Sequence, residues 1–120
     1  MVAAERGTTK LSELVDDDDD IAIAAITAAE LLVGVELANS RNRSRRQTFV
    51  EAVLSQLPIE IYDGDVARAH ATLLAEVRRK GHPRGAHDLI IAATAVTRGR
   101  TIVTDNVAHF TNLPGVLVRD

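Results

Sequence analysis

The chain has 120 residues, enough for one ordinary domain, and 46 % of them are hydrophobic, enough for a core. The net charge of −3 combines −7 over residues 1–40 with +5 over residues 41–100, so the total does not exclude a nucleic-acid partner. No apolar stretch reaches membrane-spanning length, and the absence of cysteine excludes disulfide and thiolate chemistry, which makes a cytoplasmic protein the expectation.

The first half of the chain shows mostly helical patterns. Residues 2–15 have a helical pattern and are followed by five aspartates at 16–20, expected to form a solvated loop. Residues 21–26 are short, apolar and free of charge, which is typical of a buried parallel strand. Two further helices are expected at 27–39 and 41–57.

The second half alternates strands and helices. A strand is expected at 59–62, a helix at 66–80, a strongly apolar helix at 86–97, a third strand at 101–104 and a weak last strand at 116–118. Strands separated by helices predict a single α/β domain over residues 1–120, with a parallel sheet covered by helices. Because the pattern opens with a helix, the sheet is expected to lack its first strand.

Three acidic residues are expected at one edge of this sheet. Glu30 falls at the start of the helix after strand 21–26, Asp88 at the start of helix 86–97, and Asp105 directly after strand 101–104, with Asn106 beside it. Ligands of a parallel sheet bind at the carboxyl ends of its strands, where helix N-termini also arrive. Carboxylates gathered there suit Mg²⁺, which can activate water and stabilise the charge that develops on a phosphodiester.

Each acid also has a local explanation. Thr27 and Glu30 have the spacing of a capping box. Asp88 would favour the dipole of its helix, and Asp105 with Asn106 is a common turn signal. These explanations stay open for each residue alone, whereas the convergence of all three at one edge favours a joint site. His87 and His109 flank this edge and are each expected to be local hydrogen-bond donors.

Basic residues form two clusters, each of which can be a solvated face or a phosphate-binding surface. The second cluster runs directly into the loop that leads to Asp88, which favours RNA or DNA over a small phosphoester as substrate. Its expected RNA contacts are Arg84, Arg79 and Lys80. The two clusters are Arg41, Arg43, Arg45 and Arg46, and Arg78, Arg79, Lys80 and Arg84.

Three segments resemble motifs of one family. These segments are similar to motifs of the PIN-domain ribonucleases of the VapC toxin group. They are Thr-Ala-Ala-Glu-Leu at 27–31 with Gly-Val-Glu at 34–36, the segment 79–95 around Arg-Gly-Ala-His-Asp, and the segment 104–110, which begins Thr-Asp-Asn, with 113–116. The resemblance implies a three-layer α/β/α domain and a Mg²⁺-dependent endoribonuclease, with Mn²⁺ as a possible substitute. It also implies RNA as substrate, a type II toxin–antitoxin pair with a cognate antitoxin, and a homodimer.

The resemblance also assigns site residues. Glu30 and Asp88 match the family's acidic positions and are the implied metal ligands. Asn106 matches the acid-or-amide position of the last motif, and Thr104 a supporting hydroxyl. Asp105 stays a candidate from topology alone.

The family's first strand ends in a metal-binding Asp, and residues 2–7 resemble the helix just after it. We therefore expect that strand and its Asp to be absent, through a start codon placed downstream or a truncation. Weak metal binding and poor nuclease activity would follow.

The leading hypothesis is an RNA hydrolase that leaves a 5′-phosphate, and two others stay open. A non-catalytic module would bind an antitoxin or RNA through Leu14, Leu32, Val33 and the basic helices. A small-molecule phosphatase would hydrolyse phosphomonoesters with little salt dependence, whereas a nuclease should weaken steeply with salt.

Overall fold

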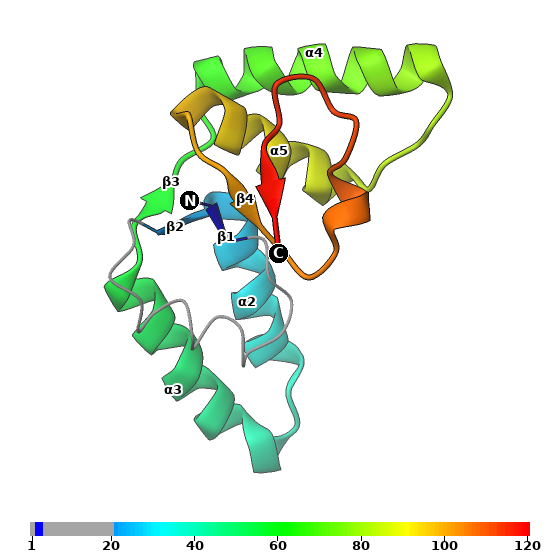
Figure 1. Cartoon of the computed structure of the whole chain (residues 1–120). Helices are drawn as coiled ribbons and strands as arrows, with labels where there is room; N and C mark the ends of the chain where they lie inside the picture. The colour runs from blue at the N-terminus through cyan, green and yellow to red at the C-terminus, as the bar shows by residue number, and fades with distance from the viewer. Residues whose placement is uncertain (1, 4–20) are drawn as a thin grey trace.

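A parallel sheet forms the centre of the computed structural model, which describes residues 2–3 and 21–120 (Figure 1). Within that part of the chain the sheet has five strands in the order β3-β2-β1-β4-β5, and each neighbouring pair is parallel. The strands are two or three residues long: β1 Val2–Ala3, β2 Ala22–Ala24, β3 Ile59–Glu60, β4 Ile102–Val103 and β5 Val118–Arg119.

The helices begin and end at recognisable signals. Asn39 and Asp63 cap α3 and α4 by accepting hydrogen bonds from backbone N–H groups three residues on. Gly81 and Gly99 follow α4 and α5 in the left-handed conformation, at φ values of 68° and 65°, which a glycine adopts without steric cost. The elements are α2 Ala25–Leu37, α3 Ser40–Gln56, α4 Gly64–Lys80, α5 Ala86–Arg98 and the short 3-10 helix η1 Val107–His109.

Two hydrophobic clusters lie on opposite faces of the sheet. Ala24 of β2 and Ile102 of β4 pack against α4 and α5, while Ile23 and Val103 pack against α2 and α3. Neighbouring residues of one strand thus enter different clusters, as the alternation of side chains along a strand requires. Figure 1 shows α4 beside α5 and α2 beside α3. The predicted three-layer α/β/α domain is confirmed.

The expectation of a missing first strand is wrong. Val2 pairs with Ala22 of β2 on one side and with Ile102 of β4 on the other, so β1 is the central strand. A strand of two residues is too short to produce an alternating pattern, and the helical pattern over residues 2–15 concealed it. Residues 4–20, which hold the rest of that pattern and the aspartate run, lie outside the described residues. The expected absence of the family's strand-end Asp stays a prediction.

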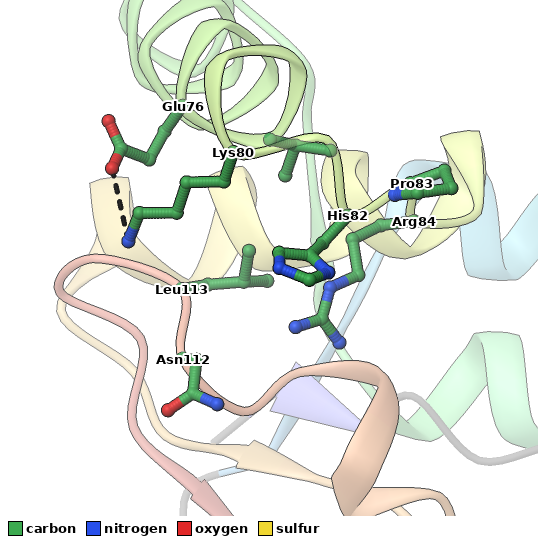
Figure 2. A pocket seen from close by; sticks show the side chains of 8 residues that line it. Glu76, Lys80, His82, Pro83, Arg84, Asn112 and Leu113 are labelled. Carbon is green, nitrogen blue, oxygen red and sulfur yellow. Dashed lines mark ion pairs between the residues drawn. The ribbon is translucent and has the colours of Figure 1, made fainter.

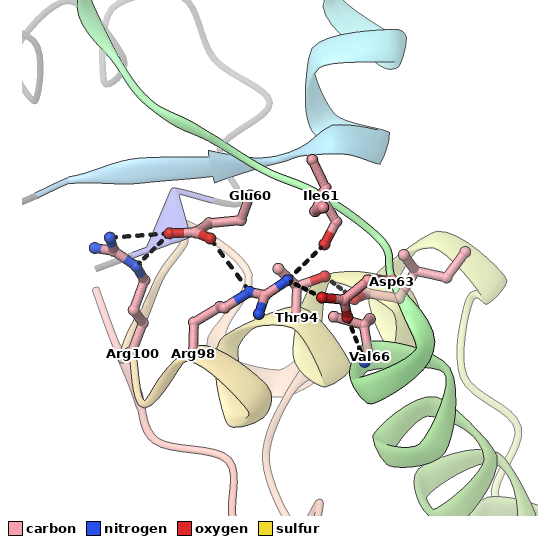
Figure 3. Close-up of polar contacts among 8 residues, drawn as sticks. Glu60, Ile61, Asp63, Val66, Thr94, Arg98 and Arg100 are labelled. Carbon is pink, nitrogen blue, oxygen red and sulfur yellow. Dashed lines mark hydrogen bonds and ion pairs between the residues drawn. The ribbon is translucent and has the colours of Figure 1, made fainter.

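A network of charges joins the end of β3 to the end of α5 (Figure 3). Arg98 contacts Asp63 Oδ2 at 3.0 Å and Glu60 Oε2 at 3.2 Å, and Arg100 contacts Glu60 Oε1 at 3.0 Å. The Val66 N–H and then Arg98 lower the pKa of the Asp63 carboxyl, and Asp63 in turn raises the pKa of Arg98.

No helix of the described residues is long and apolar enough to cross a membrane.

Candidate active site

Asp88 is a buried carboxylate in the first turn of α5, as predicted, with 8 % of its side chain exposed. The unpaired N–H groups of a first helical turn favour a negative charge at this position. His109 Nδ1 lies 3.2 Å from Asp88 Oδ2. Gly85 is so close on another side that a Cβ atom there would lie 3.1 Å from the same oxygen. The Asp88 carboxylate is therefore held within narrow limits.

Glu30 lies one turn later in its helix than the sequence indicates. Helix α2 begins at Ala25, directly after β2, so Glu30 is in the second turn. Thr27 is not the N-cap: it is buried inside the helix, and its hydroxyl has no hydrogen-bond partner among the described residues. The capping-box explanation is wrong because the two alanines after Ile23 continue readily into a helix. Glu30 instead pairs with Nδ1 of His87.

The structure brings Glu30 and Asp88 together. Both line a hollow of about 470 Å³, together with Gly85, Ala86 and His87. An adjoining hollow of about 380 Å³ is lined by Asp88, Gly85, His109, Pro83 and Arg84. Two acids from separate helices thus share one open site, each with an imidazole beside it. The expectation of local contacts for His87 and His109 is wrong, because each imidazole contacts a site carboxylate far from it in the sequence.

The last motif forms a turn beside this site. Thr104 is buried, and its hydroxyl accepts a hydrogen bond of 3.0 Å from the Asn106 backbone N–H. The Asn106 carbonyl accepts another of 3.0 Å from the His109 N–H. Asp105 and Asn106 are exposed and line neither hollow. The turn explanation fits both residues, and Thr104 supports the backbone that carries His109.

The predicted RNA contacts have different surroundings. Arg84 donates hydrogen bonds of 2.8 Å to the carbonyls of Ala108 and Thr111, so it fastens η1 to the connection between α4 and α5. Arg79 and Lys80 extend from the last turn of α4, and both contact Glu76, at 3.4 and 3.2 Å.

Gly85 is the site residue that the sequence did not predict. Its closeness to Asp88 depends on the three-dimensional path of the chain where it enters α5.

The donor set fits a hard cation. No cluster of three His, Asp or Glu side chains able to hold an ion occurs in the described part of the chain. Mg²⁺, however, commonly takes one or two carboxylates and completes its shell with water and substrate phosphate. Asp88 and Glu30 supply such a pair.

The comparisons with known proteins agree with this arrangement. A family model described as the PIN domain matches residues 1–114. The chain belongs to the PIN-domain family. The tRNA(fMet)-specific endonuclease VapC of Salmonella typhimurium is 38 % identical over 100 residues, covering 82 % of this chain and 73 % of that protein. Ribonuclease VapC2 of Rickettsia felis is 31 % identical over 108 residues, covering 90 % and 79 %.

A solved structure extends the match to the fold. The crystal structure of VapBC-5 from Mycobacterium tuberculosis, a member of the VapBC family of toxin–antitoxin systems, superposes with a TM-score of 0.76 at 28 % identity. The superposition covers 97 % of this chain and 96 % of that one. The resemblance to VapC ribonucleases is therefore confirmed by both sequence and structure.

Proposed function

We propose that this chain is an endoribonuclease and the toxin of a toxin–antitoxin pair. Its substrate is RNA, and it hydrolyses phosphodiester bonds with the help of Mg²⁺ held by Asp88 and Glu30. One observation carries the assignment of the site: these two acids, far apart in sequence, line a single hollow where α5 begins. The ribonuclease names of the VapC relatives support the reaction and the substrate class.

The bound cation would supply Lewis acidity to the phosphate and lower the pKa of a water molecule. The chain's own residues fix the geometry of the site. Asp88 is buried and held between Gly85 and His109, so it fixes one position of the site. Glu30 has 39 % of its side chain exposed, which leaves it able to hold the cation from the open side or to orient the attacking water.

Basic residues near the hollow can contact the negatively charged phosphate backbone of RNA. Lys80 and Arg79 end α4, and Arg84 lies between them and Asp88 in the chain. Such cations supply the sequence-independent part of nucleic-acid affinity. Asn106 and Asp105 stay candidate catalytic residues, and both side chains are exposed on the turn before η1.

An antitoxin partner is proposed from the VapBC toxin–antitoxin relative. Helix α2 exposes Leu32, Val33 and Leu37, with 41, 52 and 81 % of each residue accessible. Large apolar side chains exposed on one helix support binding of an apolar partner surface. Leu14, the other residue predicted for this contact, lies outside the described residues. A homodimer and a cytoplasmic location stay predictions from the resemblance and the composition.

The test of the cation site uses two glutamates of α2. Purified wild-type protein is incubated with labelled RNA in Mg²⁺, in Mn²⁺ and in EDTA. Glu30→Gln should slow cleavage about a hundredfold, as loss of a preorganised charge at a reaction centre does. Glu36→Gln is the matched control, because Glu36 is exposed and pairs with Arg43 instead.

We expect cleavage in Mg²⁺ or Mn²⁺ and none in EDTA. Equal rates for the two glutamine variants would contradict the assignment of Glu30. Cleavage that persists in EDTA would contradict the cation.

A further inference from the structure

A separate cavity of about 400 Å³ lies beside the active site (Figure 2). It opens between the connection from α4 to α5 and the turn after η1. Figure 2 shows Lys80 at the end of α4, and His82 and Arg84 in the connection that follows it, on one side of the cavity, with Asn112 and Leu113 of the turn on the other. The volume is within the range of small-ligand sites, about 300–1,000 Å³.

The cavity adjoins the site of the proposed reaction. Pro83 and Arg84 line both this cavity and the hollow that contains Asp88 and His109. The two hydrogen bonds from Arg84 to the carbonyls of Ala108 and Thr111 fix the wall between them. A molecule bound in the cavity would therefore lie next to whatever is bound at Asp88.

The lining combines three kinds of chemistry. Leu113 and Val77 are buried apolar residues, and the His82 ring offers a flat face. The Asn112 amide carries both donors and an acceptor. Lys80 and Arg84 are cationic, and the acid of the lining, Glu76, is paired with Lys80 at 3.2 Å. A ligand with a flat base, a polar edge and a negative charge matches this combination.

Asn112 has an unusual backbone conformation. Its φ of 63° makes it the non-glycine residue of positive φ in the described part of the chain. Asparagine tolerates this left-handed region better than most residues. Glycine tolerates it as well, so Asn112→Gly removes the amide without straining the turn.

We propose that this cavity binds one nucleotide of the RNA substrate, next to the phosphodiester cleaved at Asp88. Lys80 contacts its phosphate, His82 stacks on its base and Asn112 bonds to the edge of that base. Single-stranded RNA is commonly recognised in this way, by stacking and by hydrogen bonds to splayed bases. The inference rests on the proposed ribonuclease function and adds where the substrate's neighbouring nucleotide lies.

The first experiment measures affinity without cleavage. Asp88→Asn protein is titrated against fluorescent eight-residue oligoribonucleotides in Mg²⁺, and anisotropy reports binding. In this background Lys80→Gln should weaken binding about fivefold and lower the slope of log K against log salt by about 0.7, the value for one phosphate contact on a single strand. Arg78→Gln is the matched control, because it removes one charge from the same helical turn outside the cavity.

The second experiment compares the four homopolymers of A, C, G and U. The parent should prefer one of them, and Asn112→Gly should reduce that preference about tenfold, the loss expected for one bidentate base contact. Any of three results would overturn the inference. These are equal losses of RNA affinity in the Lys80 and Arg78 variants, equal affinity of the parent for all four homopolymers, and a homopolymer preference that survives in Asn112→Gly. Variants that keep RNA affinity but lose a protein partner would overturn it as well, since the cavity would then bind protein.

The two proposals fail separately. Wild-type protein that cleaves RNA while the cavity variants bind like their parent refutes the cavity alone. Wild-type protein that cleaves no RNA in either metal refutes the proposed function. Thermal unfolding of each variant shows that the protein is folded when it is titrated.

Discussion

Gly85→Ala changes the site by one methyl group without removing any functional side chain. The added Cβ would lie 3.1 Å from Asp88 Oδ2 and 3.6 Å from its Cγ, whereas 3.4–4 Å is an ordinary contact. The backbone of Gly85, at φ −59° and ψ 139°, is open to alanine, so the strain falls on the carboxylate. Asp88 must move by a few tenths of an ångström.

The expected size of the effect follows from this displacement. A catalytic group has to be held to within about 0.5 Å, and a misplacement of about 1 Å costs about a hundredfold in rate. A shift of a few tenths of an ångström should therefore lower kcat/KM for RNA about tenfold. It should also raise the Mg²⁺ concentration at which cleavage reaches half its maximal rate. The stability cost should stay near or below about 1 kcal/mol, since Gly85 is an N-cap without a side-chain hydrogen bond.

The assay is initial-rate cleavage of a labelled RNA across a Mg²⁺ titration. Gly64→Ala is the matched control, because Gly64 also stands at a helix start and a Cβ there would meet nothing within 4 Å. It should cleave at the wild-type rate. A folded Gly85→Ala protein with wild-type rate and Mg²⁺ dependence would refute the claim that the Asp88 position limits the reaction.

Three further predictions concern the frame of the site. Asp63→Asn should flatten the dependence of stability on pH below about pH 5. The pKa of the Asp63 carboxyl is lowered on folding, so its ionised form stabilises the protein above the unfolded-state pKa, and that contribution is lost as the pH falls; an acid unfolding curve identical to that of the wild type would contradict this. Arg84→Lys should cost about 1–3 kcal/mol in urea unfolding and speed amide exchange in η1, because a lysine cannot bond both carbonyls; unchanged exchange would contradict this role. Phe110→Ala should cost about 3–5 kcal/mol by the same measurement, since Phe110 is 2 % exposed; a loss below about 1 kcal/mol would contradict its place in the core.

Local signals in the sequence predict the helices well. Asp63 and Gly81 bracket α4, and the apolar run after Asp88 with Gly99 beyond it defines α5 to within one residue. The start of α2 was placed two residues late because the apolar run at 21–26 contains no cap or breaker to divide strand from helix. Strand β1 was missed because its two residues are recognisable as a strand only between β2 and β4.

Part of the candidate active site could be predicted from the sequence, and the reason is physical. Topology brings strand ends and helix starts to one edge, so the meeting of Glu30 and Asp88 follows from the order of elements. The pairing of Glu30 with His87 and of Asp88 with His109 depends instead on how α2 and η1 pack against α5. Arg84 likewise gains its backbone partners only when η1 is folded beside it.

The most direct test of the account is the rate of RNA cleavage by Asp88→Asn protein. The substitution keeps the size of the side chain and removes its charge at the buried start of α5. We predict that cleavage in Mg²⁺ and growth arrest on expression are both lost, while the protein stays folded and binds its antitoxin. Cleavage at the wild-type rate would contradict the active site, and growth arrest that persists without cleavage would favour a binding module.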